Sequence, residues 1–204
     1  EVCNKSIKRV KIPSSIELGY PFDGKADNPY LLPLISKYLK KFDLNLVVSG
    51  DEIQPAKKGL TIKQLYKNIE FDDNVFYFDR ADYFKELSDL TKIRNILGLR
   101  TAFNTVEKLL NPGTSDYAVN AAFHKPYVAK YNQIFGNNYK NLIIVKGNEG
   151  TPEIFSKCKY WQTIDGKITE YIIDPEYFGI NYKKSMHIIS PEESLNMTRN
   201  PSDE

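Results

Sequence analysis

The sequence has few of the side chains that build disulfide frameworks and metal centres. It contains only two cysteines and two histidines in 204 residues. Cys3 and Cys158 are too few and too far apart for a disulfide framework or a zinc site, and His124 and His187 lack the neighbouring ligands that a zinc or catalytic cluster needs. We therefore expect both cysteines to be plain thiols in a reducing compartment, which favours a cytoplasmic protein.

Long apolar runs and a strong excess of one charge are missing as well. The longest apolar runs, such as residues 142–145, are far too short to cross a bilayer, and the chain has no charged-then-apolar start of the kind found in signal peptides. No membrane partner is therefore expected. The net charge of +2 does not require a nucleic-acid partner. A hydrophobic share of 41% and a charged share of 26% indicate a folded globular domain.

Segments typical of strands alternate along the chain with amphipathic segments typical of helices. Such an alternation predicts right-handed crossovers in an α/β domain, with a mostly parallel sheet and helices on both faces. The predicted strands are residues 10–18, 44–48, 75–78, 117–123, 142–145 and 168–173, and the predicted helices are residues 29–42, 61–69, 79–97, 103–110 and 125–135.

The boundaries of this domain follow from the same pattern. We expect residues 1–189 to form it, and residues 190–204 to be a polar tail or the start of a truncated helix. The chain begins at Glu1 rather than Met and ends abruptly, so we expect it to be part of a longer protein.

Ligands of an open parallel sheet bind beyond the carboxyl ends of its strands, and one predicted loop there suits phosphate. This loop, residues 19–25, leads toward Asn28, an expected N-cap with Pro29 at the first helical position. A helix N-terminus offers free N–H groups and a favourable dipole to an anion. The alternative is an ordinary ordered turn. The candidate phosphate-binding residues are Gly19, Asp23, Gly24, Lys25, Asn28 and, in the next loop, Gly50.

Two further groups are candidates for charged ligands. Glu149 and Glu153, in the loop of residues 146–153, could hold magnesium if substrate phosphates complete its shell, or they could belong to a plain hydrophilic turn. Arg94 and Arg100 could each grip a carboxylate or phosphate with two N–H groups, or cap a helix.

One segment carries a family resemblance. Residues 94–104 read Arg-Asn-Ile-Leu-Gly-Leu-Arg-Thr-Ala-Phe-Asn and run on to Leu110-Asn111-Pro112. This resembles a hallmark of the anthranilate phosphoribosyltransferases, which belong to a wider pentosyl-transferring group with the pyrimidine nucleoside phosphorylases. The later segment Asp174-Pro175-Glu176-Tyr177-Phe178-Gly179 is similar to that family's Pro-Glu-x-x-Gly turn. The resemblance covers about residues 12–180.

The resemblance implies a phosphoribosyl transfer with Mg²⁺ as cofactor. The family joins an aromatic amine to phosphoribosyl pyrophosphate, so a phosphorylated ribose or another anionic ligand is the implied partner. Arg94 matches the position that holds the acceptor's carboxylate, and Glu153 matches the second acid of a metal-binding Asp-Glu pair. The family also implies a homodimer, formed through a small N-terminal helical domain that is not evident here.

The match also has departures. Where the family has a Gly-Thr-Gly-Gly-Asp phosphate loop, this chain has Gly19-Tyr-Pro-Phe-Asp-Gly24, and bulky side chains hinder close backbone approach. Ser49 departs from the family's Lys-His-Gly-Asn segment, and Pro152 replaces the first metal-binding acid. The pyrophosphate and magnesium motifs therefore look eroded. The alternative function is a non-catalytic paralogue that binds nucleic acid or another anion, with contacts from Lys5, Lys8, Arg9, Lys11, Lys37, Lys40 and Lys41.

Overall fold

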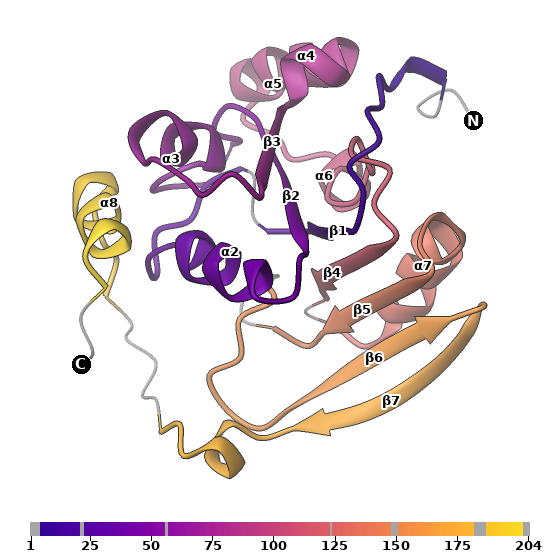
Figure 1. The fold of residues 1–204 in the computed structure, drawn as a ribbon. Coiled ribbons are helices and arrows are strands. Elements are labelled where there is room, and N and C mark those ends of the chain that lie inside the picture. The colour runs from indigo at the N-terminus through magenta and orange to yellow at the C-terminus, as the bar shows by residue number, and fades with distance from the viewer. Residues whose placement is uncertain are drawn as a thin grey trace.

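A single seven-stranded sheet organises the chain (Figure 1). The computed structural model describes residues 5–20, 23–55, 57–122, 124–147, 151–181 and 187–201. The strand order is β3-β2-β1-β4-β5-β6-β7; β1 to β5 run parallel, and β6 and β7 are antiparallel. The strands are β1 Ser15–Leu18, β2 Asn45–Gly50, β3 Val75–Asp79, β4 Tyr117–Ala121, β5 Asn141–Val145, β6 Cys158–Ile164 and β7 Lys167–Ile173.

Helices cover both faces of this sheet, which confirms the predicted α/β class (Figure 1). The α-helices are α2 Leu32–Lys40, α3 Ile62–Asn68, α4 Arg80–Tyr83, α5 Lys85–Leu97, α6 Phe103–Val106, α7 Pro126–Phe135 and α8 Pro191–Arg199, and the 3-10 helices are η1 Gly136–Asn138 and η2 Pro175–Phe178. None of the described helices is long and apolar enough to cross a membrane.

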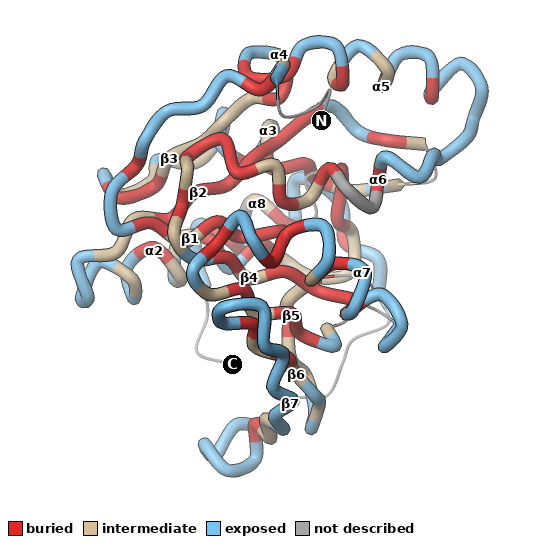
Figure 2. The backbone as a smooth tube through the Cα atoms, turned by 90° about the vertical axis from the view of Figure 1, so that its right-hand side faces the viewer, coloured by how far each residue is buried: buried red, intermediate tan, exposed pale blue. Residues whose placement is uncertain are grey.

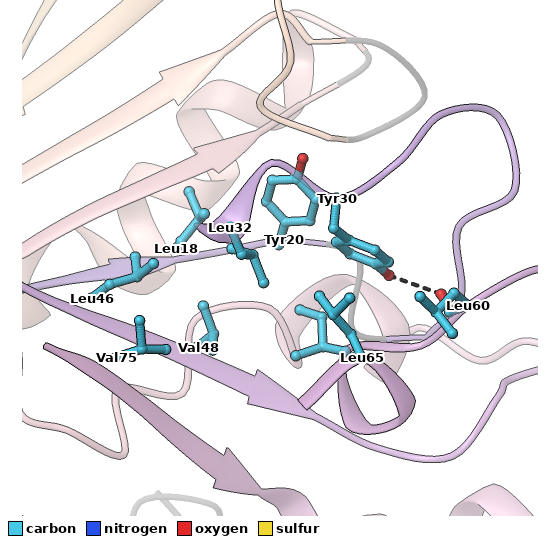
Figure 3. Packing of buried hydrophobic residues seen from close by; sticks show 10 residues of the cluster. Leu18, Tyr20, Tyr30, Leu32, Leu46, Val48, Leu60, Leu65 and Val75 are labelled. Atoms are coloured by element: carbon cyan, nitrogen blue, oxygen red, sulfur yellow. Dashed lines mark hydrogen bonds between the residues drawn. The ribbon is translucent and has the colours of Figure 1, made fainter. Parts of the chain in front are cut away.

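The main core lies between the first strands and the helices α2 and α3. Leu46 and Val48 of β2 point into this layer, where they meet Leu32 of α2 and Leu65 of α3 (Figure 3). Leu195 brings α8 onto the same cluster. Alternate residues of a strand point to opposite faces of the sheet, so a buried strand needs an apolar cover on each side.

The other face of the sheet has a second core beneath α7. Leu142 and Ile144 of β5 pack there with Val128 and Phe135 of α7 and with Trp161 of β6. Burial follows the central strands, while the outer helical surfaces and the end of the β7 hairpin are exposed (Figure 2). This face of β5 is thus fully covered, while on its other face Val145 is buried and Ile143 is half-buried.

The first predicted strand and helix are longer than the observed ones. Strand β1 starts at Ser15 because the N–H groups of Val10 and Ile12 pair with carbonyls of residues 112 and 113 instead. The predicted N-cap at Asn28 is wrong, since α2 begins at Leu32 and has Pro33 in its first turn.

The predicted helix at 79–97 is two helices. Phe84, with φ −152°, separates α4 from α5. Helical spacing with Leu87 and Leu90 predicts that Ile93 and Leu97 lie in the core, but they are 52% and 62% exposed. Gly98 ends α5 in the left-handed conformation, as its position predicts.

The predicted helix at 103–110 is short. It lasts only from Phe103 to Val106, because the chain leaves the helix where the Glu107 carboxylate turns inward to two arginines.

Strand β6 was not predicted; residues 158–164 lie in what the sequence reads as a loop. They pair antiparallel with both β5 and β7. The turn between β6 and β7 is Asp165-Gly166, and both residues have positive φ, 50° and 74°. An Asp-Gly pair between two apolar segments is a strong hairpin signal, so this strand could have been found.

Capping boxes start α3 and α8. Thr61 and Gln64, which have the capping-box spacing in the sequence, form the box of α3, and Ser190 and Glu193 form that of α8. Helix α8 extends over nine residues, and its Arg199 donates a 2.7 Å hydrogen bond to the carbonyl of Asn68, the last residue of α3. Residues 190–199 are therefore a docked helix.

Candidate functional site

The carboxyl ends of the parallel strands provide the natural place for a ligand. From β1 the chain runs outward to β2 and β3 and then returns to β4 on the other side of β1. An open sheet has its crevice where the order reverses in this way, here between β1 and β4. Gly19 follows β1 at this point, and its N–H donates to the carbonyl of Val119 in β4 at 2.7 Å.

A buried polar group, which we call the crevice cluster, lies beside the end of β1. It consists of Tyr20, Lys25, Asn28, Thr151 and Glu153. The Tyr20 hydroxyl and the Lys25 ammonium both donate to Oε1 of Glu153. The Asn28 amide and the Thr151 hydroxyl donate to Oε2 at 3.1 and 3.0 Å. Three of the sequence-predicted site residues, Lys25, Asn28 and Glu153, thus meet at one point.

The crevice cluster does not fit a magnesium ion. A carboxylate has about four lone-pair sites, and four donors already engage Glu153. One of these donors is itself a cation, with a side chain only 1% exposed. Glu149, the other predicted metal ligand, falls outside the described residues. Among the described residues, no group of three or more acidic, histidine or cysteine side chains could hold a metal ion.

Two tyrosine rings enclose the Lys25 ammonium. Tyr20 and Tyr30 lie side by side in the core cluster (Figure 3). Their ring centres are 5.2 Å apart, and Nζ of Lys25 is 5.1 and 5.2 Å from them. Burial raises the pKa of Tyr20 well above its ordinary value, so its hydroxyl stays protonated and donates to Glu153. Burial lowers the pKa of Lys25, and the Glu153 carboxylate opposes that shift. Tyr20 is therefore part of the core rather than a side chain lining an open crevice.

Arg94 holds a carboxylate, but the carboxylate belongs to this chain. Its Nη2 lies 2.6 Å from Oε1 of Glu107, and its Nη1 donates to Gln54 at 3.1 Å. Arg80 grips the other oxygen of Glu107 at 2.6 Å and lies 3.4 Å from Asp51. We call Asp51, Arg80, Arg94 and Glu107 the buried ion network. The sequence singles out only Arg94 in it, and its role in acceptor binding stays a prediction.

Three positive side chains lie close to one another near Asp23, which follows β1 in the chain. Arg100 makes a 2.9 Å ion pair with Asp23 and is itself 40% exposed. Burial lowers the pKa of Lys108 to about 8, with the charges of Lys57 and Arg100 adding to the shift and Asp23 opposing it. These charges therefore lie close together, and we call Lys57, Arg100 and Lys108 the cationic rim. The sequence predicts Asp23 as a site residue but misses Lys57 and Lys108.

The predicted phosphate-loop glycines have packing reasons for lacking a side chain. A Cβ on Gly19 would lie 2.6 Å from the amide oxygen of Asn120, and one on Gly50 would lie 2.8 Å from the ring of Tyr77. Gly24 has φ +120°, which disfavours any side chain. Close packing at Gly19 and Gly50 leaves them little room to cradle a ligand.

Two buried polar atoms near the switch point have no partner among the described residues. They are Nδ2 of Asn120, a donor at the end of β4, and Oδ1 of Asn28, an acceptor in the crevice cluster. Buried polar groups are nearly always hydrogen-bonded, so atoms left over are places where a ligand or water binds. The carboxyl ends of β1 and β4 thus offer both a donor and an acceptor.

Sequence comparison places this chain among known proteins. The model of the glycosyl transferase family, α/β domain, matches residues 52–201. An uncharacterised protein of Aquifex aeolicus is 32% identical over 90% of this chain and 61% of its own length. An anthranilate phosphoribosyltransferase of Aromatoleum aromaticum is 28% identical over 68% of this chain and 42% of its own length. The chain therefore spans about half the length of the curated relatives it matches.

Solved structures share the fold. The anthranilate phosphoribosyltransferase of Thermus thermophilus superposes with a TM-score of 0.71 at 14% identity, over 97% of this chain and 64% of the other. That of Saccharomyces cerevisiae, in complex with phosphoribosyl pyrophosphate and Mg, has a TM-score of 0.68 at 16% identity, over 96% and 58%. These similarities confirm the predicted resemblance, and the family model covers well over half of the chain. The chain belongs to the glycosyl transferase family that this α/β domain defines.

Proposed function

We propose that this chain is a phosphoribosyltransferase-like domain that binds a phosphorylated ribose, or a closely related anion, at the carboxyl ends of β1 and β4. The observation that carries the proposal is the cationic rim, where Arg100 pairs with Asp23 and Lys108 lies within range of the charges of Lys57, Arg100 and Asp23. The fold supports the ligand class, because the yeast structure with this fold holds phosphoribosyl pyrophosphate. That support is an analogy between folds, so the experiment below tests the rim itself.

The rim has the chemistry that a phosphate group requires. The Arg100 guanidinium is 40% exposed and pairs with Asp23 through Nη2. It can donate two of its N–H groups to phosphate oxygens while it keeps this contact with Asp23. Lys108 has a pKa of about 8, so near that pH part of it is uncharged. A bound anion would raise this pKa, and ligand binding near pH 8 is then accompanied by proton uptake.

We further propose that the family's pyrophosphate and magnesium motifs are eroded here. Tyr20 packs in the core beside the loop, and Glu153 is saturated by four donors. Transfer of a ribosyl group requires the charge of the departing group to be neutralised. With these groups engaged elsewhere, we expect ligand binding to be retained better than turnover.

A small anion fits the charge distribution better than nucleic acid does. Lys37, Lys40 and Lys41 lie on or beside α2, on one face of the sheet. The basic stretch at residues 5–11 lies elsewhere, because its Ile7 packs with Tyr83 of α4 and Leu87 of α5, in a cluster separate from the one beneath α2. The two groups therefore form no single positive surface along which a nucleic-acid backbone could run.

Calorimetric titration with phosphoribosyl pyrophosphate tests the proposal. We expect binding to the unaltered chain, and weaker binding in a Lys108→Ala variant. A Lys37→Ala variant removes an exposed lysine on α2 and should bind like the original. Near pH 8 the measured heat should depend on the buffer's ionisation enthalpy, and this dependence should vanish in Lys108→Ala. An absence of heat at millimolar ligand would refute the proposal.

A further inference from the structure

The ammonium group of Lys25 occupies a shell of oxygen atoms inside the crevice cluster. The carbonyl of Pro29 accepts from it at 2.8 Å, the Tyr20 hydroxyl lies at 3.4 Å, and Oε1 of Glu153 pairs with it. The side chain is 1% exposed, so this shell replaces its water. A carboxylate, a main-chain carbonyl and a neutral oxygen are also the donors that hard divalent cations prefer.

The crevice cluster also contains a buried oxygen that no donor in the described part of the chain satisfies. Asn28 donates its amide N–H to Oε2 of Glu153, while its own Oδ1 is buried with no partner among the described residues. An amide oxygen is an acceptor and a suitable cation ligand, and it cannot be satisfied by another acceptor. The cluster is therefore richer in oxygen donors to a cation than the single lysine requires.

We infer that the Lys25 ammonium takes the place of a divalent cation beside Glu153, so that this domain binds its anionic ligand without a metal. The ammonium contributes one fixed positive charge and engages the carboxylate lone pairs that a metal would need. A second cation at this point would meet the ammonium's charge at close range in a buried setting, where charges are poorly screened. The part concerning the anionic ligand rests on the proposed function; the part concerning the metal does not.

The inference predicts that removal of the ammonium uncovers a cation site. In Lys25→Ala, the Glu153 carboxylate loses its counter-ion and stays buried, and the Pro29 carbonyl loses the ammonium that it accepts from. An uncompensated buried carboxylate is costly, and a divalent cation that enters the vacated space relieves that cost. The variant should therefore gain a metal site that the original chain lacks.

Titration with Mn²⁺ alone, followed by electron paramagnetic resonance of the free ion, tests this directly. Lys25→Ala should bind one Mn²⁺ at least about tenfold more tightly than the unaltered chain. Lys58→Ala, which removes an exposed lysine of a neighbouring loop, should behave like the unaltered chain. A double variant, Lys25→Ala with Glu153→Gln, should lose the gained site. Mg²⁺ should raise the melting temperature of Lys25→Ala only.

Several outcomes would overturn the inference. One is a folded Lys25→Ala variant that binds Mn²⁺ no better than the original; if it does not fold, Lys25→Met, which keeps the aliphatic stem, takes its place. Another needs no variant: in the unaltered chain, the nuclear magnetic resonance signals of Thr151 and Glu153 should stay sharp when Mn²⁺ is added, and their broadening would overturn the inference. Phosphoribosyl pyrophosphate should bind equally well with EDTA and with Mg²⁺. If it binds in neither case, the proposed function fails while the Mn²⁺ results still decide the metal inference.

Discussion

The buried ion network gives the sharpest test of what holds the crevice together. Glu107 is fully buried and receives Arg80 and Arg94 on its two oxygens, each at 2.6 Å. The change Glu107→Gln keeps the shape of the side chain and removes its charge. Asp51, 3.4 Å from Arg80, is then the remaining carboxylate of the buried ion network, which still holds two guanidinium groups. An excess positive charge inside the protein has neither water nor a counter-ion to offset it.

The expected loss of stability follows from that imbalance. Breaking a buried ion pair by removal of one partner costs roughly 3–5 kcal/mol. At about 1.4 kcal/mol for each factor of ten, this lowers the folded-to-unfolded ratio by a factor of roughly one hundred to a few thousand. Much of a small domain's total stability, about 5–15 kcal/mol, would be lost.

Urea unfolding of the single variant and of a compensating double variant measures this cost. Adding Arg94→Met to Glu107→Gln removes one cation as well, so Asp51 and Arg80 balance again. The double variant should recover at least about 1 kcal/mol relative to the single one. Asp73→Asn, at an exposed pair with Lys40, should change stability little. A small loss in Glu107→Gln, or no recovery in the double variant, would refute the charge-balance argument.

Three further changes test individual features. Burial raises the pKa of Glu17 from 4.5 to about 7. The free energy of unfolding of the original chain therefore falls as the pH rises through that range, because the folded state disfavours the charged carboxylate. Between these limits Glu17→Gln should gain roughly 3 kcal/mol relative to the original chain, as measured by urea unfolding across pH. A pH-independent difference would contradict this. Ser190→Ala removes the side-chain cap of α8 and should cost about 1 kcal/mol in thermal unfolding, whereas Ser190→Asn should restore most of it. Gly166→Ala meets no atom within 4 Å, so only its left-handed backbone counts, and a loss of about 1–2 kcal/mol is expected.

Much of the fold follows from patterns that the sequence displays locally. The alternation of apolar strands with amphipathic helices predicts the parallel part of the sheet, and the capping box at Thr61 and the stop at Gly98 mark helix ends correctly. The errors arise where distant contacts override local preference. Asn28 has the side chain of an N-cap, but Glu153, far along the chain, takes its amide, and α2 starts later.

The candidate site could be located from the sequence better than it could be interpreted. The rule that ligands bind at the carboxyl ends of parallel strands brings Lys25 and Glu153 to the same crevice, and the structure places them in contact. The side chains that pair with the predicted residues could not be predicted in the same way. Nothing in the spacing of Arg94 and Glu107 shows that they pair, because the contact depends on how the chain turns after α6.

The same limit explains why a motif comparison alone misjudges this crevice. A list of matched positions treats Arg94 and Glu153 as binding groups that wait for a substrate carboxylate and a metal. In the folded chain each already has an internal partner of opposite charge: Glu107 for Arg94 and Lys25 for Glu153. An incoming ligand must therefore displace a buried partner, which then loses its own counter-ion, rather than only displace water. Binding at either point is costly for that reason, whereas the Arg100 guanidinium is 40% exposed and an anion can reach it by displacing water. The electrostatics thus favour the outer rim over the inner crevice as the place where this chain meets an anion.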